Sequence, residues 1–385
     1  MDLLGVAKQI VRFRKQPYVA LNTVVVFQNA LKHNHFELQK RHPHSAICPV
    51  LKSNAYGHGL TQTAPIFDKL NCPFLVVDSL YEAYELHKIG TKTPILIMGY
   101  TIPQNFTLKP VPFHIAVFDI DLARTLNEYQ QGCNIHIFID TGMSREGVTV
   151  SELPSFLQEI RKLKNLKVVG LCSHLADADN PINTSHMDSQ IVEFKKALAI
   201  TRELGFDPIW RHISASSGAF KMQDDVFTLL RVGLAHYGIS PLEETDPHAN
   251  TVSLMPALEF HSTLAQVKKI QKGTSVGYGC TYTSKDDRIL GLIPAGYYEG
   301  VDRRLSNKGF VKIRGKFFPF VGRISMNMSV VDITNLDDPK IGESVIVYSS
   351  SPTDKNSLIN AAKTAETIPY DLMVHLAESV KRIVK

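Results

Sequence analysis

Cysteine is scarce in this sequence, and the five cysteines present show no pairing pattern. Their number is odd, they lie far apart, and no CxxC motif occurs. These features argue against a disulfide framework and are typical of a reducing compartment. We therefore expect a cytoplasmic protein, and we expect no metal site.

Long apolar runs and clusters of a single charge are also missing. No stretch is long enough to span a bilayer, so we expect no membrane insertion. The first residues, MDLLGVAKQIVRFRKQP, alternate apolar and basic side chains and lack the apolar centre of a signal peptide. The 42 basic and 37 acidic residues are spread along the chain, which argues against nucleic acid as a partner.

What the first two-thirds of the chain does have is a regular alternation of short β-branched runs with helix-like segments. The clearest helical patterns cover residues 80–89 and 189–204. Strands that alternate with helices predict parallel βαβ units, and eight strands are what a closed (β/α)₈ TIM barrel requires. We predict the eight strands at residues 46–51, 74–77, 94–98, 114–118, 135–139, 167–172, 208–213 and 231–237.

After about residue 247 the pattern changes, because strand-like stretches follow one another directly and helical spacing returns only near 357–367. This pattern predicts a mostly-β domain. The expected α/β architecture is a barrel over residues 1–247 and a C-terminal β domain over 248–385, with the N-terminal segment a candidate to pack on the β domain. The β-domain strands are expected at 254–267, 288–294, 310–313, 317–320, 329–333 and 344–348.

Lys52 follows the first predicted strand, at the end of a barrel where enzymes place their reactive groups. Partial desolvation there favours the neutral amine, which can form a Schiff base with an aldehyde cofactor. A solvated lysine at a strand end is the alternative, and position alone favours it. The following residues, SNAYGHG, combine two glycines, an aromatic and an amide, which indicates a tight loop around a ligand.

The string VLKSNAYGHG closely resembles the cofactor-lysine motif of the alanine racemases, a family of fold type III enzymes that use pyridoxal phosphate. Any other single match would be weak, because an isolated tyrosine, histidine or arginine usually has a packing or surface role. The family's motifs nevertheless recur here in one consistent order. They are DTGMSR (140–145), CSH (172–174), HISASS (212–217), RVGL (231–234), VGYG (276–279), AGY (295–297), GRISMN (322–327) and IPY (368–370).

The resemblance implies that pyridoxal 5'-phosphate is held by Lys52. Arg145 would reach the phenolic oxygen of the cofactor, and Arg231 would face its pyridine nitrogen. The remaining cofactor-binding residues implied by the resemblance are Tyr56, His174, Ser216, Gly233, Leu234 and Tyr370.

Racemisation requires a base on one face of the substrate Cα and an acid on the other. The resemblance assigns the proton of the D-enantiomer to Lys52 and that of the L-enantiomer to Tyr278, which His174 and Arg231 would activate. Tyr278 would come from the partner subunit, which implies a homodimer with shared active sites. The substrate-binding residues would be Arg145, Met326, Tyr297 and Asn327, with Arg303, Arg323 and Asp179 along the access channel.

The chain departs from the family pattern near this site. Phe138 stands where many members carry a carbamylated lysine that braces the active-site arginine, so we expect Arg145 to find another partner, such as a chloride ion or a side-chain amide. Asn327 replaces an aspartate, and Ser325, Tyr298 and Glu299 also differ. These changes leave the substrate range in question.

Four functions follow from the sequence. The leading hypothesis is an alanine racemase that supplies D-alanine for peptidoglycan, and the nearest alternative is a serine or broad-specificity racemase. A decarboxylase with the same barrel and cofactor is disfavoured by the opposed Lys52 and Tyr278. A non-catalytic cofactor carrier is disfavoured because over a hundred further residues with site motifs follow the barrel.

Overall fold

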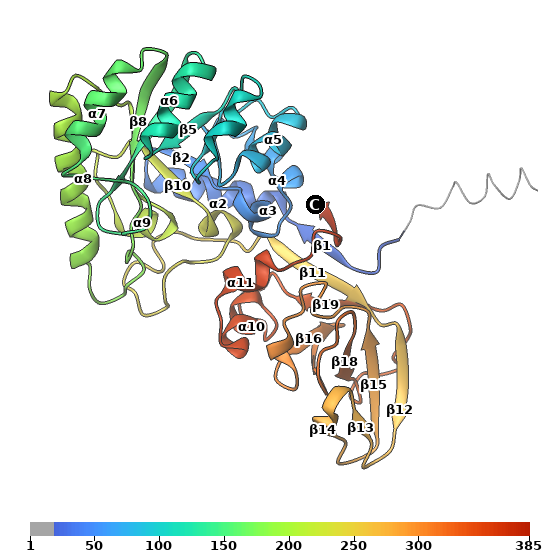
Figure 1. The fold of residues 1–385 in the computed structure, drawn as a ribbon. Coiled ribbons are helices and arrows are strands. Elements are labelled where there is room, and N and C mark those ends of the chain that lie inside the picture. Colours follow the sequence, from blue (N-terminus) through green and yellow to red (C-terminus); the bar gives the residue numbers. More distant parts are fainter. Residues whose placement is uncertain (1–18) are drawn as a thin grey trace, which may run out of the picture.

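Eight parallel strands close a barrel in the computed structural model, which describes residues 19–385 (Figure 1). The first 17 residues, which we do not expect to be a signal peptide, lie outside this range. Most neighbouring strands pair along the series β3-β4-β5-β6-β8-β9, and β10 pairs with β2. A bridge between Val50 and Val76 and a hydrogen bond from the Arg231 amide to the Ser214 carbonyl (3.2 Å) complete the circle. The strands are β2 (Ala46–Pro49), β3 (Leu75–Val77), β4 (Ile95–Ile97), β5 (His114–Val117), β6 (Cys133–Asp140), β8 (Leu166–Cys172), β9 (Trp210–His212) and β10 (Leu229–Val232).

The barrel prediction is confirmed, and seven of its strands lie within a few residues of the expected places. The eighth was predicted too long, because β10 ends at Val232 and Leu234–Tyr237 forms the 3₁₀ helix η2. Gly233, with φ −104° and ψ −92°, turns the chain between them. Its amide and that of Ala235 then donate to the Ser216 hydroxyl instead of continuing a strand ladder.

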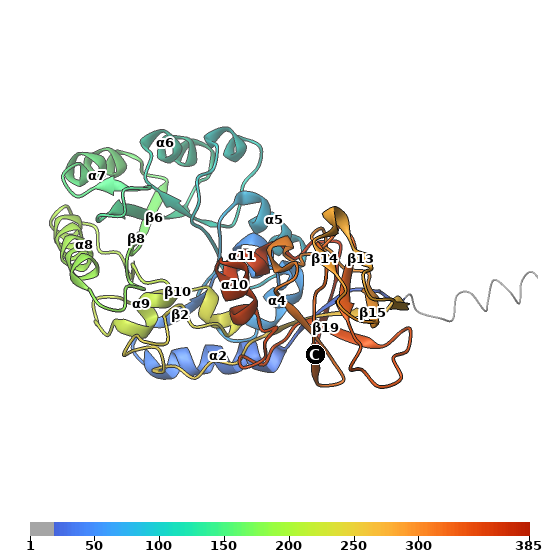
Figure 2. The same ribbon diagram turned by 90° about the horizontal axis from the view of Figure 1, so that it is seen from below.

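Helices surround the strands, as the view from below shows (Figure 2). Local signals in the sequence fix several of their ends. Ser79 accepts from the Glu82 amide while the Glu82 carboxylate accepts from the Ser79 amide, a capping box that starts α5. The helices are α2 (Gln28–Arg41), α3 (Lys52–Tyr56), α4 (Leu60–Phe67), α5 (Leu80–Lys88), α6 (Ile120–Tyr129), α7 (Leu153–Lys162), α8 (Ser185–Glu203) and α9 (Ser216–Lys221), with η1 (Pro103–Thr107) and the short strand β7 (Val148–Thr149).

The C-terminal part is mostly β, as predicted, with a six-stranded sheet in the order β17-β16-β19-β11-β1-β20 and a three-stranded sheet β12-β15-β18. β1 (Thr23–Val26) pairs with β11 of this domain before the chain enters the barrel. The predicted strand 254–267 is in fact β11 and the start of β12. The other strands are β11 (Leu258–Thr263), β12 (Gln266–Ile270), β13 (Ser275–Val276), β14 (Tyr282–Thr283), β15 (Arg288–Ile293), β16 (Phe310–Ile313), β17 (Lys316–Pro319), β18 (Ser329–Asp332), β19 (Ser344–Tyr348) and β20 (Lys381–Val384).

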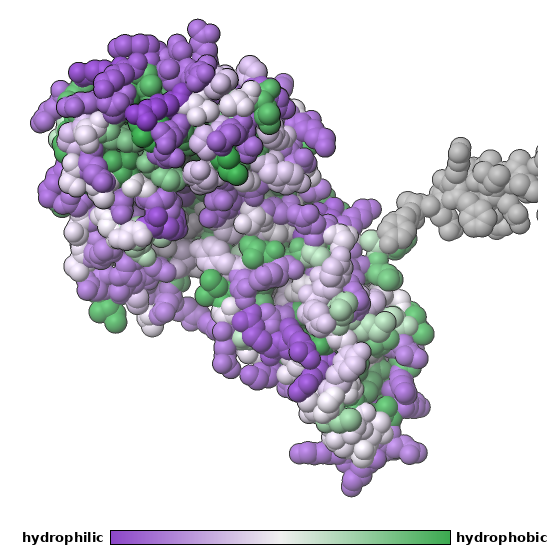
Figure 3. Space-filling model, viewed as in Figure 1, coloured by the Kyte–Doolittle hydropathy of each residue, from purple (hydrophilic) through white to green (hydrophobic). Residues whose placement is uncertain are grey.

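Barrel and β domain share one continuous apolar core. A single cluster of buried side chains includes Phe67 and Ile137 of the barrel together with Phe260 and Val345 of the β domain. The outer surface of the barrel is largely hydrophilic in the view of Figure 3, and hydrophobic residues lie where the two parts meet. Among residues 19–385, no helix has the length and apolar character needed to cross a membrane.

Two short C-terminal helices, α10 (Leu358–Ala365) and α11 (Pro369–Val374), lead from the β domain back to the barrel. α11 packs on α3, and the Arg382 guanidinium donates to the Gly57 carbonyl just after α3 (3.1 Å). Gly57 has φ +78°, and a Cβ at this position would lie 1.9 Å from the Met373 carbonyl oxygen. The close approach of α11 to the barrel therefore requires glycine at position 57.

Gly57→Ala is expected to lower the free energy of unfolding by more than about 2 kcal/mol, because it adds a backbone clash to the cost of positive φ. Gly90→Ala is the matched control, since Gly90 has φ +80° and open space around its Cβ position. Urea denaturation of both variants measures the difference. Equal destabilisation of the two variants would show that α11 does not depend on Gly57.

Candidate active site

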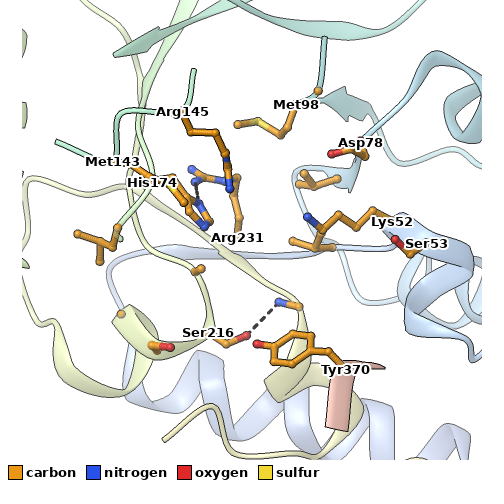
Figure 4. Close-up of a pocket in the computed structure, with 18 of the residues that line it drawn as sticks. Lys52, Ser53, Asp78, Met98, Met143, Arg145, His174, Ser216, Arg231 and Tyr370 are labelled. Carbon is orange, nitrogen blue, oxygen red and sulfur yellow. Dashed lines mark hydrogen bonds between the residues drawn. The ribbon is translucent and has the colours of Figure 1, made fainter. Parts of the chain in front are cut away.

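A cavity of about 450 Å³ opens at the carboxyl ends of the barrel strands. This volume lies within the usual range for small-molecule sites, about 300–1,000 Å³. Figure 4 shows Lys52, Arg145, His174 and Arg231 around it, with Ser216 and Tyr370 on one side. The cavity-lining residues that the sequence predicted are Lys52, Tyr56, Arg145, His174, Asp179, Ser216, Arg231, Gly233 and Tyr370.

Lys52 begins a turn of unusual backbone conformation. Residues 53–56 all have φ between 52° and 55°, a left-handed turn that costs roughly 1–2 kcal/mol for each non-glycine residue. Two hydrogen bonds to side chains stabilise this turn. The Ser53 backbone amide donates to the Glu82 carboxylate (2.7 Å), and the Asn54 side-chain oxygen accepts from the Leu60 backbone amide (2.7 Å). Strain of this kind persists at sites where the backbone must place a functional group. Here it directs the Lys52 amine into the cavity (Figure 4).

Hydrogen-bond donors gather opposite Lys52 and can hold an anion. The Ser216 hydroxyl lies 3.2 Å from the Gly233 amide and 3.3 Å from the Ala235 amide, and the Tyr370 hydroxyl points toward the same place (Figure 4). A Cβ on Gly233 would come within 2.2 Å of the Tyr56 hydroxyl, so only glycine allows Tyr56 to lie there. Leu234, which starts η2, has a buried side chain and does not line the cavity. These donors match the oxygens of a phosphate group.

Arg231 is the buried centre of the site's hydrogen bonds. Its guanidinium donates to the Ser173 carbonyl (2.7 Å), to the His212 ring and to His174 Nδ1 (3.2 Å). Burial lowers the pKa of His174 to about 3, and the charges of Arg231, Arg145 and Lys52 add to the effect. His174 is therefore neutral, and because Arg231 must donate to Nδ1, its Nε2 carries the proton. Within residues 19–385 this N–H has no hydrogen-bond partner, and His174 lines the cavity.

A chain of histidines continues from Arg231 through the barrel interior. His212 Nε2 lies 2.9 Å from His136 Nδ1, and His136 Nε2 lies 3.2 Å from His114 Nδ1. Because arginine can only donate, His212 and then His136 must accept on Nδ1 and donate from Nε2, and His114 accepts on Nδ1. Burial lowers the pKa of all three rings, so the chain is neutral and fixes the orientation of Arg231.

The protein is expected to lose stability as the pH falls below about 6.5. Several histidines are neutral in the folded state until a much lower pH, whereas in the unfolded chain they bind protons near 6.5. The unfolded state therefore binds more protons in this window, and the free energy of unfolding falls by about 1.4 kcal/mol per pH unit for each such histidine. Urea denaturation between pH 7.5 and 5 measures this slope, and a flat profile would contradict it. Burial lowers the pKa to about 4 for His35 and His58, and to about 3 for His174 and His236.

Among the described residues, the partner of Arg145 is a carboxylate and not the side-chain amide that the sequence suggested. Both carboxylate oxygens of Glu146 accept from its guanidinium, through Nε and through Nη2 (2.6 Å). This hydrogen bond raises the pKa of Arg145. Phe138 is buried beside Met98 and Phe118 and lines the cavity without a charge. Sequence reasoning missed Glu146, as it missed His136, His212 and Asp78.

Apart from Tyr370, the site residues predicted in the β domain do not line this cavity; they are Tyr278, Tyr297, Met326 and Asn327. Tyr278 lies in η3 (Tyr278–Cys280), between β13 and β14, which are at the end of the β domain away from the barrel (Figure 1). Its side chain is 69% exposed. Tyr297 and Met326 are also exposed, and their segments are joined by a hydrogen bond from the Tyr297 amide to the Ser325 carbonyl (3.0 Å). The side-chain amide of Asn327 donates to the Glu299 carboxylate (2.8 Å).

Two family models cover most of the chain. The model of the alanine racemase N-terminal domain matches residues 26–241, and that of the alanine racemase C-terminal domain matches residues 257–384. The chain belongs to the alanine racemase family. The resemblance found in its sequence motifs is thereby confirmed.

Individual members of the alanine racemase family are similar over nearly the whole length. The chain is 32% identical over 366 residues to the alanine racemase of Geobacter sulfurreducens, covering 92% of this chain and 94% of that protein. The crystal structure of alanine racemase from Streptomyces lavendulae superposes with a TM-score of 0.87 at 28% identity, covering 96% and 98%. The alanine racemase from Bacillus anthracis, solved with bound L-Ala-P, gives 0.88 at 28% identity over 96% of each chain.

The described residues fit a phosphorylated aldehyde of this enzyme family. Lys52 supplies an amine for the aldehyde, and the donors around Ser216 fit the phosphate. Arg145 and Arg231 can donate hydrogen bonds to further oxygen atoms and to a ring nitrogen. Of the two proton carriers predicted from the sequence, the cavity contains Lys52 but not Tyr278.

Proposed function

We propose that this protein interconverts L-alanine and D-alanine and uses pyridoxal 5'-phosphate as its cofactor. The observation that carries the proposal is the cavity in which Lys52 faces a set of phosphate donors, in a chain of the alanine racemase family. When bound, the cofactor withdraws electrons from the substrate Cα and makes its proton removable. The protein's own residues then decide where that proton goes.

In this proposal residues 1–247 bind the cofactor, and residues 248–385 supply a second proton carrier. Lys52 takes and returns the proton on one face of the substrate. Tyr278 of the partner subunit does so on the other face, because its exposed position in its own chain leaves it available to a neighbour. The protonated Nε2 of His174 lies at the cavity and would donate to the Tyr278 hydroxyl.

A homodimer follows from this arrangement, since neither chain has both proton carriers in its own cavity. Exposed apolar side chains on the β domain support it, because Tyr297, Tyr298 and Met326 would be covered by a partner. The substrate carboxylate would meet Arg145 and the backbone amide of Met326. Asn327, which is bonded to Glu299, adds no charge there.

Racemisation of single L-amino acids, followed by chiral chromatography, tests the proposal. We expect alanine to have the highest kcat/KM, with serine the next substrate. A clear preference for serine or for a larger amino acid would favour the alternative of a serine or broad-specificity racemase. Release of carbon dioxide without racemisation would contradict both.

A further inference from the structure

Charged side chains of both signs line the cavity. Lys52, Arg145 and Arg231 all line it. Three carboxylates, Asp78, Glu146 and Asp179, line it as well. Only Glu146 has a direct contact with one of the three cations among the described residues, through its pairing with Arg145.

This contact fixes the plane of the Arg145 guanidinium. Two parallel N–H donors on Arg145 meet the two carboxylate oxygens of Glu146, and paired charge-assisted hydrogen bonds of this kind define an orientation. Within residues 19–385 the guanidinium donates to no other group. Three of its five N–H bonds stay free for an acceptor in the cavity.

The backbone that carries Arg145 and Glu146 is tied down on both sides. Before it, the Asp140 carboxylate accepts from the amides of Gly142 (2.9 Å), Met143 (3.0 Å) and Ser144 (3.0 Å). After it, β7 returns to pair with the end of β6. Gly147, at φ +120°, allows this return, because a Cβ there would lie 2.4 Å from the Asp140 amide. The loop is thus fixed, whereas the long Arg145 side chain depends on Glu146 for its direction.

We propose that Glu146 is a positioning residue of the active site, which orients Arg145 toward the cofactor and the substrate carboxylate and offsets its charge. The proposal rests on the proposed function for the identity of those acceptors. Phe138, which faces the same cavity, has no polar atom and cannot share this role. Glu146 acts through Arg145 and does not itself touch the reacting atoms.

A double-mutant cycle tests whether Glu146 works through Arg145. Glu146→Gln keeps the size of the side chain but can no longer accept two charged hydrogen bonds, so kcat/KM for alanine should fall by about 10- to 100-fold, mainly through KM. In an Arg145→Lys background the same change should cost less than about twofold. The visible absorption of the bound cofactor should shift in Glu146→Gln and should not shift further in the double variant.

The matched control is Glu159→Gln, which removes an exposed carboxylate that pairs with Arg124 (3.6 Å) and Lys162 and does not line the cavity. It should leave rate and spectrum unchanged. Thermal melting of each variant shows whether a loss of activity comes from unfolding or from a misplaced Arg145 side chain. The role of Glu146 would be overturned if Glu146→Gln lowered kcat/KM as much in the Arg145→Lys background as in the wild type. An unshifted spectrum in Glu146→Gln would overturn it as well. Absence of racemase activity in the wild type would instead contradict the proposed function, and the spectral comparison would still decide the role of Glu146.

Discussion

Lys52→Ala is expected to abolish both racemisation and the visible absorption of protein-bound pyridoxal phosphate. The lysine has two roles in the proposal, as the covalent anchor of the cofactor and as one of the two proton carriers. Removal of a positioned proton carrier alone costs about 10²- to 10⁴-fold, so the combined loss should reach at least about 10⁴-fold. Chiral chromatography of the product and an absorption spectrum after gel filtration measure the two effects.

Two further variants make this result specific to Lys52. Lys52→Arg keeps the positive charge but cannot form the covalent link, so it should be as inactive as Lys52→Ala. Lys69→Ala removes an exposed lysine that does not line the cavity and should leave activity unchanged. A Lys52→Ala protein that keeps wild-type absorption and rate would show that another group holds the cofactor.

Tyr278→Phe is expected to lower racemisation of alanine by about 10²- to 10⁴-fold, because phenylalanine cannot transfer a proton. The loss must be equal in both directions, since the enantiomers have equal free energies. Exchange of the Cα proton with solvent deuterium should not be symmetric. The variant should still exchange the proton of D-alanine through Lys52, while exchange on L-alanine is lost.

Mass spectrometry of each enantiomer after incubation in deuterium oxide measures this asymmetry. Tyr282→Phe is the control, because Tyr282 lies on β14 close to Tyr278 in the chain and does not line the cavity. Exchange of L-alanine at the wild-type rate by Tyr278→Phe would rule out tyrosine as the carrier on that face.

Much of the fold could be predicted from the sequence, because local patterns and packing agree. The capping box of Ser79 and Glu82 marks the start of α5, and the β-branched runs coincide with the barrel strands. The end of the eighth strand could not be predicted. It depends on hydrogen bonds from Gly233 and Ala235 to Ser216, which is 17 residues away from Gly233 in the chain.

The candidate site was predictable where a residue stands in a motif, and not where its role arises from a side-chain contact. Lys52, Arg231 and Ser216 were found in this way, and all three line the cavity. Glu146 follows Arg145 directly, and adjacency in sequence does not indicate that the two side chains turn to face each other. His136 belongs to no motif, and only the geometry of the barrel brings it against His212.

The central claim is that Lys52 of one subunit and Tyr278 of the partner subunit form one site, and hybrid dimers test it most directly. The Lys52→Ala and Tyr278→Phe proteins, each expected to be nearly inactive, are mixed in equal amounts after dissociation and allowed to reassociate. If the sites are shared, every hybrid dimer has one intact site and one site with both changes. Random pairing then restores about a quarter of wild-type activity. If both residues act within the same chain, the mixture stays as inactive as its components, and the shared site is wrong.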